Sequence, residues 1–359
     1  MMLWSPKKII GKIGRKYGGA FYKKAHARCF AFLHHLNISR QTLPLFFGLP
    51  SADPLFKRLD RELYSDLSSA RAEDYPEGVI VILDGSFTHG GLTDRIRGIL
   101  SVYEECKRRH LPFFISWTRP FPLERYLLPA NPERLDWRIG SKDVARDRRS
   151  AKMAVADDLT DAENRFRLRG AFLFPKRQLH IYTNADTSRG RYQQLFNELF
   201  LPSPILRESI DRHLSRMTPG YHAFAFRFMT LLDDFTDCQL PQLSAQEQEG
   251  LMVKVERELK ILIEDVPQDK SIFITGDSLR FLNRVRDLDP RIYIVEGDIR
   301  HIDRDQEIPE DVELKTFTDQ FLLMNAARVT LLRTGMMYNS GFSRFAAEVG
   351  GAEFINHLF

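Results

Sequence analysis

The run Val79-Ile-Val-Ile-Leu83 is continuously aliphatic and ends abruptly at Asp84-Gly85. An uninterrupted apolar run of this length is typical of a strand that is buried on both faces of a parallel sheet. A glycine-bearing loop follows, then apolar residues at helical spacing over residues 96–106, then a second strand-like segment at 112–117. Strand, glycine loop, helix and strand form one βαβ unit, which predicts a doubly wound α/β layer.

The same alternation returns in the second half of the chain. Strand-like segments at 221–228, 271–275, 291–295 and 329–332 alternate with helical segments, one of which opens with the capping box Ser244-Ala-Gln-Glu247. This pattern predicts a second Rossmann-like domain that begins after Pro219-Gly220. A length of 359 residues also exceeds what one hydrophobic core usually supports. We therefore expect a basic N-terminal helical extension over 1–74, a first Rossmann-like domain over 75–219 and a second Rossmann-like domain over 220–359.

The first 50 residues carry nine Lys and Arg side chains and no Asp or Glu, whereas the rest of the chain carries 43 basic and 48 acidic residues. Apolar residues lie between these charges without forming the continuous apolar region of a signal peptide. A basic helical extension of this kind favours attachment of residues 1–40 to an anionic membrane surface. A basic helix packed on the body is the alternative, and nothing else in the sequence supports nucleic acid as a partner.

Composition argues against a membrane-spanning, a disulfide-rich or a metal-binding protein. No stretch reaches the roughly 18 apolar residues of a membrane-spanning helix, and three scattered cysteines fit a reducing compartment better than a disulfide framework. Neither Asp287-Leu-Asp289 nor His34-His35 has partners at metal-ligand spacing, so no metal site is expected. Residues 134–152 hold seven basic residues and three aspartates, which predicts an exposed loop or a solvated helix face. We expect a cytoplasmic protein that is peripheral at the inner face of the membrane.

Candidate site residues stand where the predicted strands end, because ligands of doubly wound sheets bind at the carboxyl ends of the strands. Gly90 and Gly91 after the first strand allow close backbone approach to an anion at a helix N-terminus, or simply form a turn. The loop matches neither a P-loop nor the dinucleotide fingerprint.

Arg227 ends an otherwise apolar strand and must find an anionic partner, because a buried unpaired charge is costly. That partner is either a bound phosphate, which suits the guanidinium fork, or a carboxylate of Asp233 or Asp234.

Two further turns follow predicted strands. Asp277 and Ser278 follow Thr275-Gly276 and either contact a nucleotide base or ribose or cap the next helix. The turn Asn339–Ser343 offers hydroxyls and backbone N–H groups to a pyrophosphate, or is again a helix cap.

Four segments, taken in order, resemble one family. They are His89-Gly-Gly-Leu-Thr-Asp-Arg-Ile-Arg-Gly98, Phe226-Arg-Phe228 with Leu231-Leu-Asp-Asp-Phe235, Thr275-Gly-Asp-Ser278, and Ser340-Gly-Phe-Ser-Arg-Phe-Ala-Ala347. Their order is similar to that in fucosyltransferase-like glycosyltransferases of GT-B architecture, which include bacterial polysaccharide and nodulation-factor enzymes and protein O-fucosyltransferases. The resemblance covers residues 78–350 and implies two Rossmann-like domains that face each other across a cleft. It implies that residues 75–219 form the acceptor-side domain and residues 220–359 the nucleotide-sugar-binding domain.

The resemblance implies an inverting, metal-independent transfer of fucose from GDP-fucose to a hydroxyl of a glycan or lipid-linked saccharide in surface polysaccharide synthesis, without a cofactor. Arg227 matches the arginine on the donor β-phosphate, and Asp277, followed by Ser278, matches the acidic residue near the nucleotide. The remaining matches are the diphosphate turn Ser340, Gly341, Phe342 and Ser343, and the donor-facing glycines Gly90 and Gly91.

An inverting transfer also needs a base for the acceptor hydroxyl. His89 and Asp94, beside the glycine loop, are the candidates, and Asp94 could equally be a first-turn aspartate favoured by the helix dipole. Ala225 stands where the family has a histidine two residues before Arg227. A catalytically silent nucleotide-sugar or glycan-binding protein of the same fold is therefore the alternative hypothesis.

Overall fold

The computed structural model describes residues 54–66, 71–87, 89–156, 161–173, 176–235, 242–302 and 308–359. The predicted membrane-binding segment, residues 1–40, lies outside these ranges. Contacts within the chain divide it into two compact units. Of the described residues, the first unit contains those before Leu83, Glu105–Phe114 and Ile139–Thr187, and the second contains those in Leu83–Glu104, Ile115–Arg138 and Ser188–Phe359. The domain boundary at Gly220 stays a prediction.

The first sheet has the strand order β2-β1-β5-β4. Its strands are β1 (Gly78–Leu83), β2 (Phe113–Trp117), β4 (Ala151–Ala156) and β5 (Gln178–Thr183), and β5 pairs in parallel with both β1 and β4. All six residues of β1 are buried, as the aliphatic run predicts. Helix α4 (Leu92–Arg109) follows β1, while α3 (Pro54–Leu63) and α5 (Asp161–Ala171) contact β4.

The basic stretch at 134–152 is only partly the exposed segment that its charge predicts. Trp137 and Ala145 are fully buried, and Lys152 lies inside β4. Lys152 points its Nζ at the carbonyls of Ala171, 2.8 Å away, and Leu173, so its charge stabilises the end of α5. The prediction of an exposed loop or a solvated helix face is confirmed for Arg134, Arg138, Lys142 and Arg149, which are exposed. It is wrong for Trp137, Ala145 and Lys152, whose packing and partners the local sequence does not reveal.

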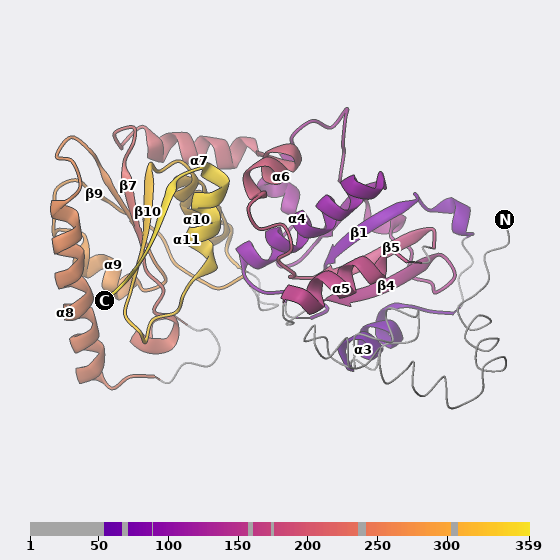
Figure 1. The fold of residues 1–359 in the computed structure, drawn as a ribbon, viewed down its shortest axis with the longest axis horizontal. Coiled ribbons are helices and arrows are strands. Elements are labelled where there is room, and N and C mark those ends of the chain that lie inside the picture. Colours follow the sequence, from indigo (N-terminus) through magenta and orange to yellow (C-terminus); the bar gives the residue numbers. More distant parts are fainter. Residues whose placement is uncertain are drawn as a thin grey trace, which may run out of the picture. The chain divides into compact units, whose positions relative to one another are not determined.

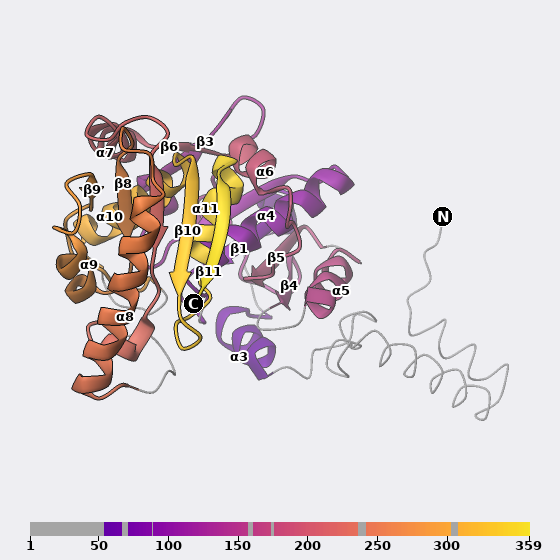
Figure 2. The same cartoon turned by 60° about the vertical axis from the view of Figure 1, so that its left-hand side comes forward.

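The second sheet is parallel throughout, with the order β11-β10-β7-β8-β9. In it α8 and α9 lie on one side and α10 and α11 on the other, as Figures 1 and 2 show. The strands are β7 (His222–Ala225), β8 (Ile272–Thr275), β9 (Ile292–Tyr293), β10 (Arg328–Arg333) and β11 (Glu353–Leu358). The helices are α8 (Ala245–Glu264), α9 (Leu279–Val285), α10 (Glu310–Met324) and α11 (Gly341–Gly350).

Shorter elements join the two sheets along the chain. They are α6 (Tyr192–Leu199), α7 (Pro204–Leu214) and the small antiparallel pair β3 (Leu127–Pro129) with β6 (Phe200–Pro202). Helix α6 contacts α11, and α7 contacts α10. Aromatic contacts such as Tyr192 with Phe345, whose ring centroids lie 4.9 Å apart, hold these helices in the second unit.

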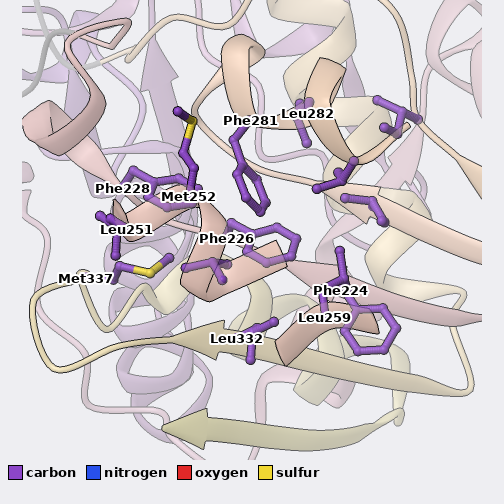
Figure 3. Packing of buried hydrophobic residues seen from close by; sticks show 14 of the residues in the cluster. Phe224, Phe226, Phe228, Leu251, Met252, Leu259, Phe281, Leu282, Leu332 and Met337 are labelled. Carbon is purple, nitrogen blue, oxygen red and sulfur yellow. The ribbon is translucent and has the colours of Figure 1, made fainter. Parts of the chain in front are cut away.

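The core of the second sheet positions the loop after β7 (Figure 3). Phe226 and Phe228 are both buried, and each packs its ring against Phe281 of α9 at a centroid distance of 4.9 Å. Their rings are nearly parallel, so the two side chains point to the same side of the chain. Because alternate residues of an extended segment point to opposite sides, Arg227 between them is directed out of this core.

Candidate functional site

Arg227 stands two residues beyond the end of β7, and two contacts fix its guanidinium. NH1 lies 3.3 Å from Oδ2 of Asp277, and the guanidinium carbon lies 4.6 Å from the ring centroid of Phe235. The side chain remains 18% exposed. Arg227 therefore keeps a charged, oriented head group at the surface of the second unit.

Asp277 is the ion-pair partner that the structure shows for Arg227, whereas the sequence suggested Asp233 or Asp234. Strands β7 and β8 are neighbours, so their carboxyl ends bring Arg227 and Asp277 together. Asp234 instead accepts hydrogen bonds from the Ser278 hydroxyl at 2.7 Å and the Arg280 N–H at 3.0 Å.

Asp277 also holds the backbone of the loop after β7. Its Oδ1 accepts from Phe228 N at 2.8 Å and its Oδ2 from Met229 N at 2.7 Å. Met229 has a φ of 55°, a left-handed conformation that costs a non-glycine residue about 1–2 kcal/mol. Complete burial raises the pKa of Asp277, and Arg227 and the two N–H donors act in the opposite direction. These contacts make Asp277 a positioning residue for Arg227 and leave its predicted contact with the nucleotide as a prediction.

Ser278 and Ser340 are both helix caps. The Ser278 hydroxyl accepts from Phe281 N at 3.1 Å and begins α9, and the Ser340 hydroxyl accepts from Phe342 N at 3.2 Å and begins α11. The capping alternative is therefore confirmed for both residues, and their contact with a donor stays a prediction. The turn that contains Ser340 is hydrogen-bonded to the loop after β7, which carries Arg227 and is called the arginine loop below, because Tyr338 N donates to Arg227 O at 3.1 Å.

The glycine loop after β1 belongs to the same compact unit as Arg227. Gly90 has a φ of 78°, and a Cβ there would lie 2.8 Å from the Asp94 Cβ. Gly91 N donates to the Asp94 carboxylate at 3.2 Å, so Asp94 caps the start of α4 as a first-turn aspartate. The Asp94 side chain is nevertheless 48% exposed and accessible to a substrate.

His89 differs from Asp94 in both burial and charge. It is fully buried, its Nε2 lies 4.0 Å from Asp84 Oδ1, and neither ring nitrogen has a hydrogen-bond partner in the described part of the chain. Burial, together with the nearby positive charge of Arg95, lowers the pKa of His89 to about 3, and Asp84 partly opposes both effects. A neutral imidazole with so low a pKa is a weak base, which favours Asp94 over His89 as the candidate base.

Several residues of this region were missed by the sequence reasoning. Arg95 is buried and donates to Gly90 O at 2.9 Å, Arg119 O at 2.9 Å and Ile302 O at 3.2 Å, which fixes the glycine loop. His301 places its Nε2 3.4 Å from where a Cβ of Gly91 would lie, and its ring contacts that of Phe235 edge-on. Only long-range packing brings these residues together, so no local signal could have found His301.

Arg97 and Gln320 join α4 to α11. Arg97 NH2 donates to Gly341 O at 3.1 Å. Gln320 donates through Nε2 to Phe342 O at 3.3 Å, and its Oε1 accepts from the Thr93 hydroxyl at 3.5 Å. Ser343, in the first turn of α11, is buried, and its hydroxyl has no partner among the described residues. The predicted glycine loop and diphosphate turn thus lie side by side.

Comparison with known proteins gives a likeness of fold. No family model matches the sequence, and no curated protein matches it. A solved structure of a FUT1 variant from Arabidopsis thaliana in complex with GDP matches over 84% of this chain and 74% of its own, with 12% identity and a TM-score of 0.50. The chain has a fucosyltransferase-like GT-B fold. This confirms, at the level of fold, the resemblance and the α/β class that the sequence motifs predict.

Two other fucosyltransferase structures show a weaker likeness. NodZ from Bradyrhizobium matches 75% of this chain and 92% of its own, with 13% identity and a TM-score of 0.47. POFUT1 in complex with GDP matches 79% and 99%, with 12% identity and a TM-score of 0.45.

Metal and membrane signals were searched in the described residues alone. No group of three or more His, Cys, Asp or Glu side chains converges there as a metal site would require. None of the described helices combines the length and hydropathy of a membrane-spanning segment.

Proposed function

We propose that the protein is an inverting, metal-independent glycosyltransferase that transfers fucose from GDP-fucose to a hydroxyl of a glycan or lipid-linked saccharide. The observation that carries the proposal is the guanidinium of Arg227, which Asp277 and Phe235 hold at a strand end with part of its surface exposed. The fold likeness to a fucosyltransferase bound to GDP supports the donor class.

The chemistry follows from the charges at this end of the sheet. In the transfer, the bond between the sugar C1 and the β-phosphate oxygen breaks, and the acceptor oxygen forms a new bond to C1 from the opposite face. GDP leaves with the electron pair, and Arg227 and the N–H groups that open α11 neutralise the growing charge on its phosphate. Asp94 accepts the proton of the acceptor hydroxyl.

The acceptor and the cellular location extend the proposal beyond the described residues. We infer that the basic segment 1–40 holds the protein at the inner face of a membrane, where a lipid-linked acceptor in surface polysaccharide synthesis would be found. Deleting residues 1–40 should release the protein from acidic vesicles and leave GDP binding intact. Unfolding of the truncated protein would contradict this role.

A nucleotide panel tests the donor assignment. GDP should raise the melting temperature of the wild-type protein, because a ligand that binds only the folded state stabilises it by mass action. UDP, CMP and dTDP at the same concentration should have little effect. Stabilisation by UDP or CMP but not by GDP would overturn the fucosyltransferase assignment.

A catalytically silent binding protein is the second candidate, and two observations favour it. His89 is held neutral in a buried position, and Ala225 occupies the place of the family's histidine. Such a protein would be stabilised by GDP-fucose without releasing GDP. Measured GDP release, with and without a panel of glycan acceptors, separates the two candidates.

A further inference from the structure

Arg97 packs against the first residue of α11. Its NH2 donates to Gly341 O, and a Cβ on Gly341 would lie 2.5 Å from that same nitrogen and 2.8 Å from NH1. Contacts this short do not occur, so the guanidinium can occupy its position only because residue 341 is glycine. The Phe345 ring lies 5.8 Å from the guanidinium carbon and supports it from α11.

The guanidinium of Arg97 and the N-terminus of α11 bring two positive features together, which favours an anion between them. The N-terminus of a helix carries about half a positive charge, and a cation beside it is repelled rather than stabilised. Arg97 is only 14% exposed, so solvent screens this repulsion weakly. The carboxylate of Asp94 lies 3.5 Å from NH1 and is half exposed.

A second feature of the same helix end also indicates a ligand. The Ser343 hydroxyl is 1% exposed and has no hydrogen-bond partner among the described residues, although buried hydroxyls are normally satisfied. The turn before α11 is bonded to the backbone of Arg227 through Tyr338. A cation, a helix N-terminus and an unused hydroxyl therefore adjoin the arginine loop.

We propose that Arg97 is the second cation of a diphosphate site, in which Arg227 is the first and the opening turn of α11 supplies N–H and hydroxyl donors. This inference rests on the proposed function, since it names the residue that completes its donor site. A nucleoside diphosphate carries two phosphate groups, and two separate guanidinium groups match that charge without a bound metal. Arg97 thereby distinguishes a diphosphate from a nucleoside or a monophosphate.

The test measures how binding depends on ligand charge. Dissociation constants for GDP, GMP and guanosine should be measured by titration calorimetry on the full chain, for the wild type, Arg97→Gln and Arg97→Lys. Arg108→Gln is the matched control, because Arg108 lies on the same helix, is 56% exposed and pairs with Glu105. Melting temperatures show whether each variant is folded.

Arg97→Gln should weaken GDP binding roughly tenfold or more, as loss of a charge-assisted hydrogen bond does, and change guanosine binding little. Arg97→Lys should retain part of the GDP affinity, and Arg108→Gln all of it. An equal loss for GDP and guanosine, or no loss, would overturn the inference. Should Arg97→Gln fail to fold, Gly341→Ala provides the same comparison, because its methyl group displaces the guanidinium.

Failure of the inference and failure of the proposed function give different results. If the wild type binds UDP in place of GDP, the donor assignment is wrong. A loss of UDP affinity in Arg97→Gln that exceeds the loss of uridine affinity would still support the diphosphate site. If the wild type binds neither nucleotides nor inorganic diphosphate, both the function and the inference are wrong.

Discussion

The loop after β7 and the loop after β1 each place an ionisable side chain at the end of a buried strand, and the two side chains meet opposite environments. Asp277 lies 3.3 Å from the guanidinium of Arg227, and Phe235 stacks on it. His89 is more deeply buried, and its nearest carboxylate oxygen is 4.0 Å away. The comparison shows how residue type and partner act together: an arginine stays protonated in any protein environment and is oriented here by a carboxylate from the neighbouring strand, whereas burial holds His89 neutral.

This difference in charge and exposure also gives Arg227 and His89 different roles. A permanently charged, partly exposed guanidinium can neutralise a phosphate, whereas a buried neutral imidazole cannot readily take a proton from a substrate. The exposed acid of the β1 loop is Asp94, whose carboxylate is held by Gly91 N. The following predictions test this division, beginning with the largest effect.

Arg227→Lys should lower turnover by about 10²–10³-fold, because lysine cannot form two parallel hydrogen bonds to a phosphate whose charge grows in the transition state. The melting temperature should change little, since the ammonium group still faces Asp277. Turnover of GDP-fucose and thermal unfolding are the measurements. Arg333→Lys at the end of β10, where the side chain is half-buried and bonds Asn356, is the control and should keep full activity. Unchanged turnover and unchanged melting in Arg227→Lys would remove Arg227 from both the catalytic and the structural role.

Asp94→Asn should lower turnover by about 10²-fold, the lower end of what loss of a general base costs. The asparagine oxygen can still accept from Gly91 N, so the loop should remain in place. His89→Gln should lower turnover less than tenfold, because the neutral imidazole is a weak base. Steady-state turnover of both variants at pH 7 is the measurement, and the reverse order of effects would assign the base to His89.

The unfolding free energy should decrease as the pH is lowered, because His89 is buried and neutral in the folded protein. The pKa is about 3 in the folded protein and about 6.5 when unfolded, so below pH 6.5 the unfolded state binds a proton that the folded state does not. The resulting loss approaches about 1.4 kcal/mol per pH unit on going from pH 6 to pH 4. Denaturant unfolding at pH 7, 6, 5 and 4 measures it, and His89→Leu should show a correspondingly flatter dependence. Equal slopes in the two proteins would mean that His89 is protonated or exposed in the folded state.

Removal of metal ions by a chelator should have the smallest effect on the rate of transfer. Transfer should continue unchanged after treatment with EDTA, because Arg227 and the N-terminus of α11 supply the positive charge that a metal would otherwise provide. The rate of GDP release with EDTA, and with manganese or magnesium restored, is the measurement. Strict dependence on an added metal would show that the guanidinium groups do not suffice.

The sequence predicts the strands better than the contacts at their ends. The aliphatic runs at 79–83 and 272–275 and the capping box at Ser244 lie where expected, because each is specified by adjacent residues. The strand predicted over 221–228 ends at Ala225, since Asp277 draws the next residues into a turn. The sequence pattern predicts a helix only over Asp319–Ala327, whereas α10 begins at Glu310 and ends at Met324.

In the candidate site, too, the sequence predicts the positions of residues along the chain better than their contacts. The motifs place Arg227, Asp94 and the turn at Ser340 at strand ends or helix starts, which follows from the βα alternation. The choice of Asp277 as partner of Arg227 depends on strand order, and the contact of Arg97 with Gly341 depends on packing between residues 244 positions apart. Neither strand order nor such packing is encoded in a local pattern.

The second compact unit is assembled from three separate stretches of chain, and this has a consequence for the order of events during synthesis. Tyr126 stacks on Phe317 at 4.6 Å, and Tyr192 packs on Phe345. When the first member of each pair leaves the ribosome, its partner has not yet been translated. Residues 83–104 and 115–138 must therefore wait with apolar side chains exposed until α10 and α11 emerge. That interval is when chaperones and proteases compete with native packing, so slow translation of the last third of the chain should lower the yield of folded protein.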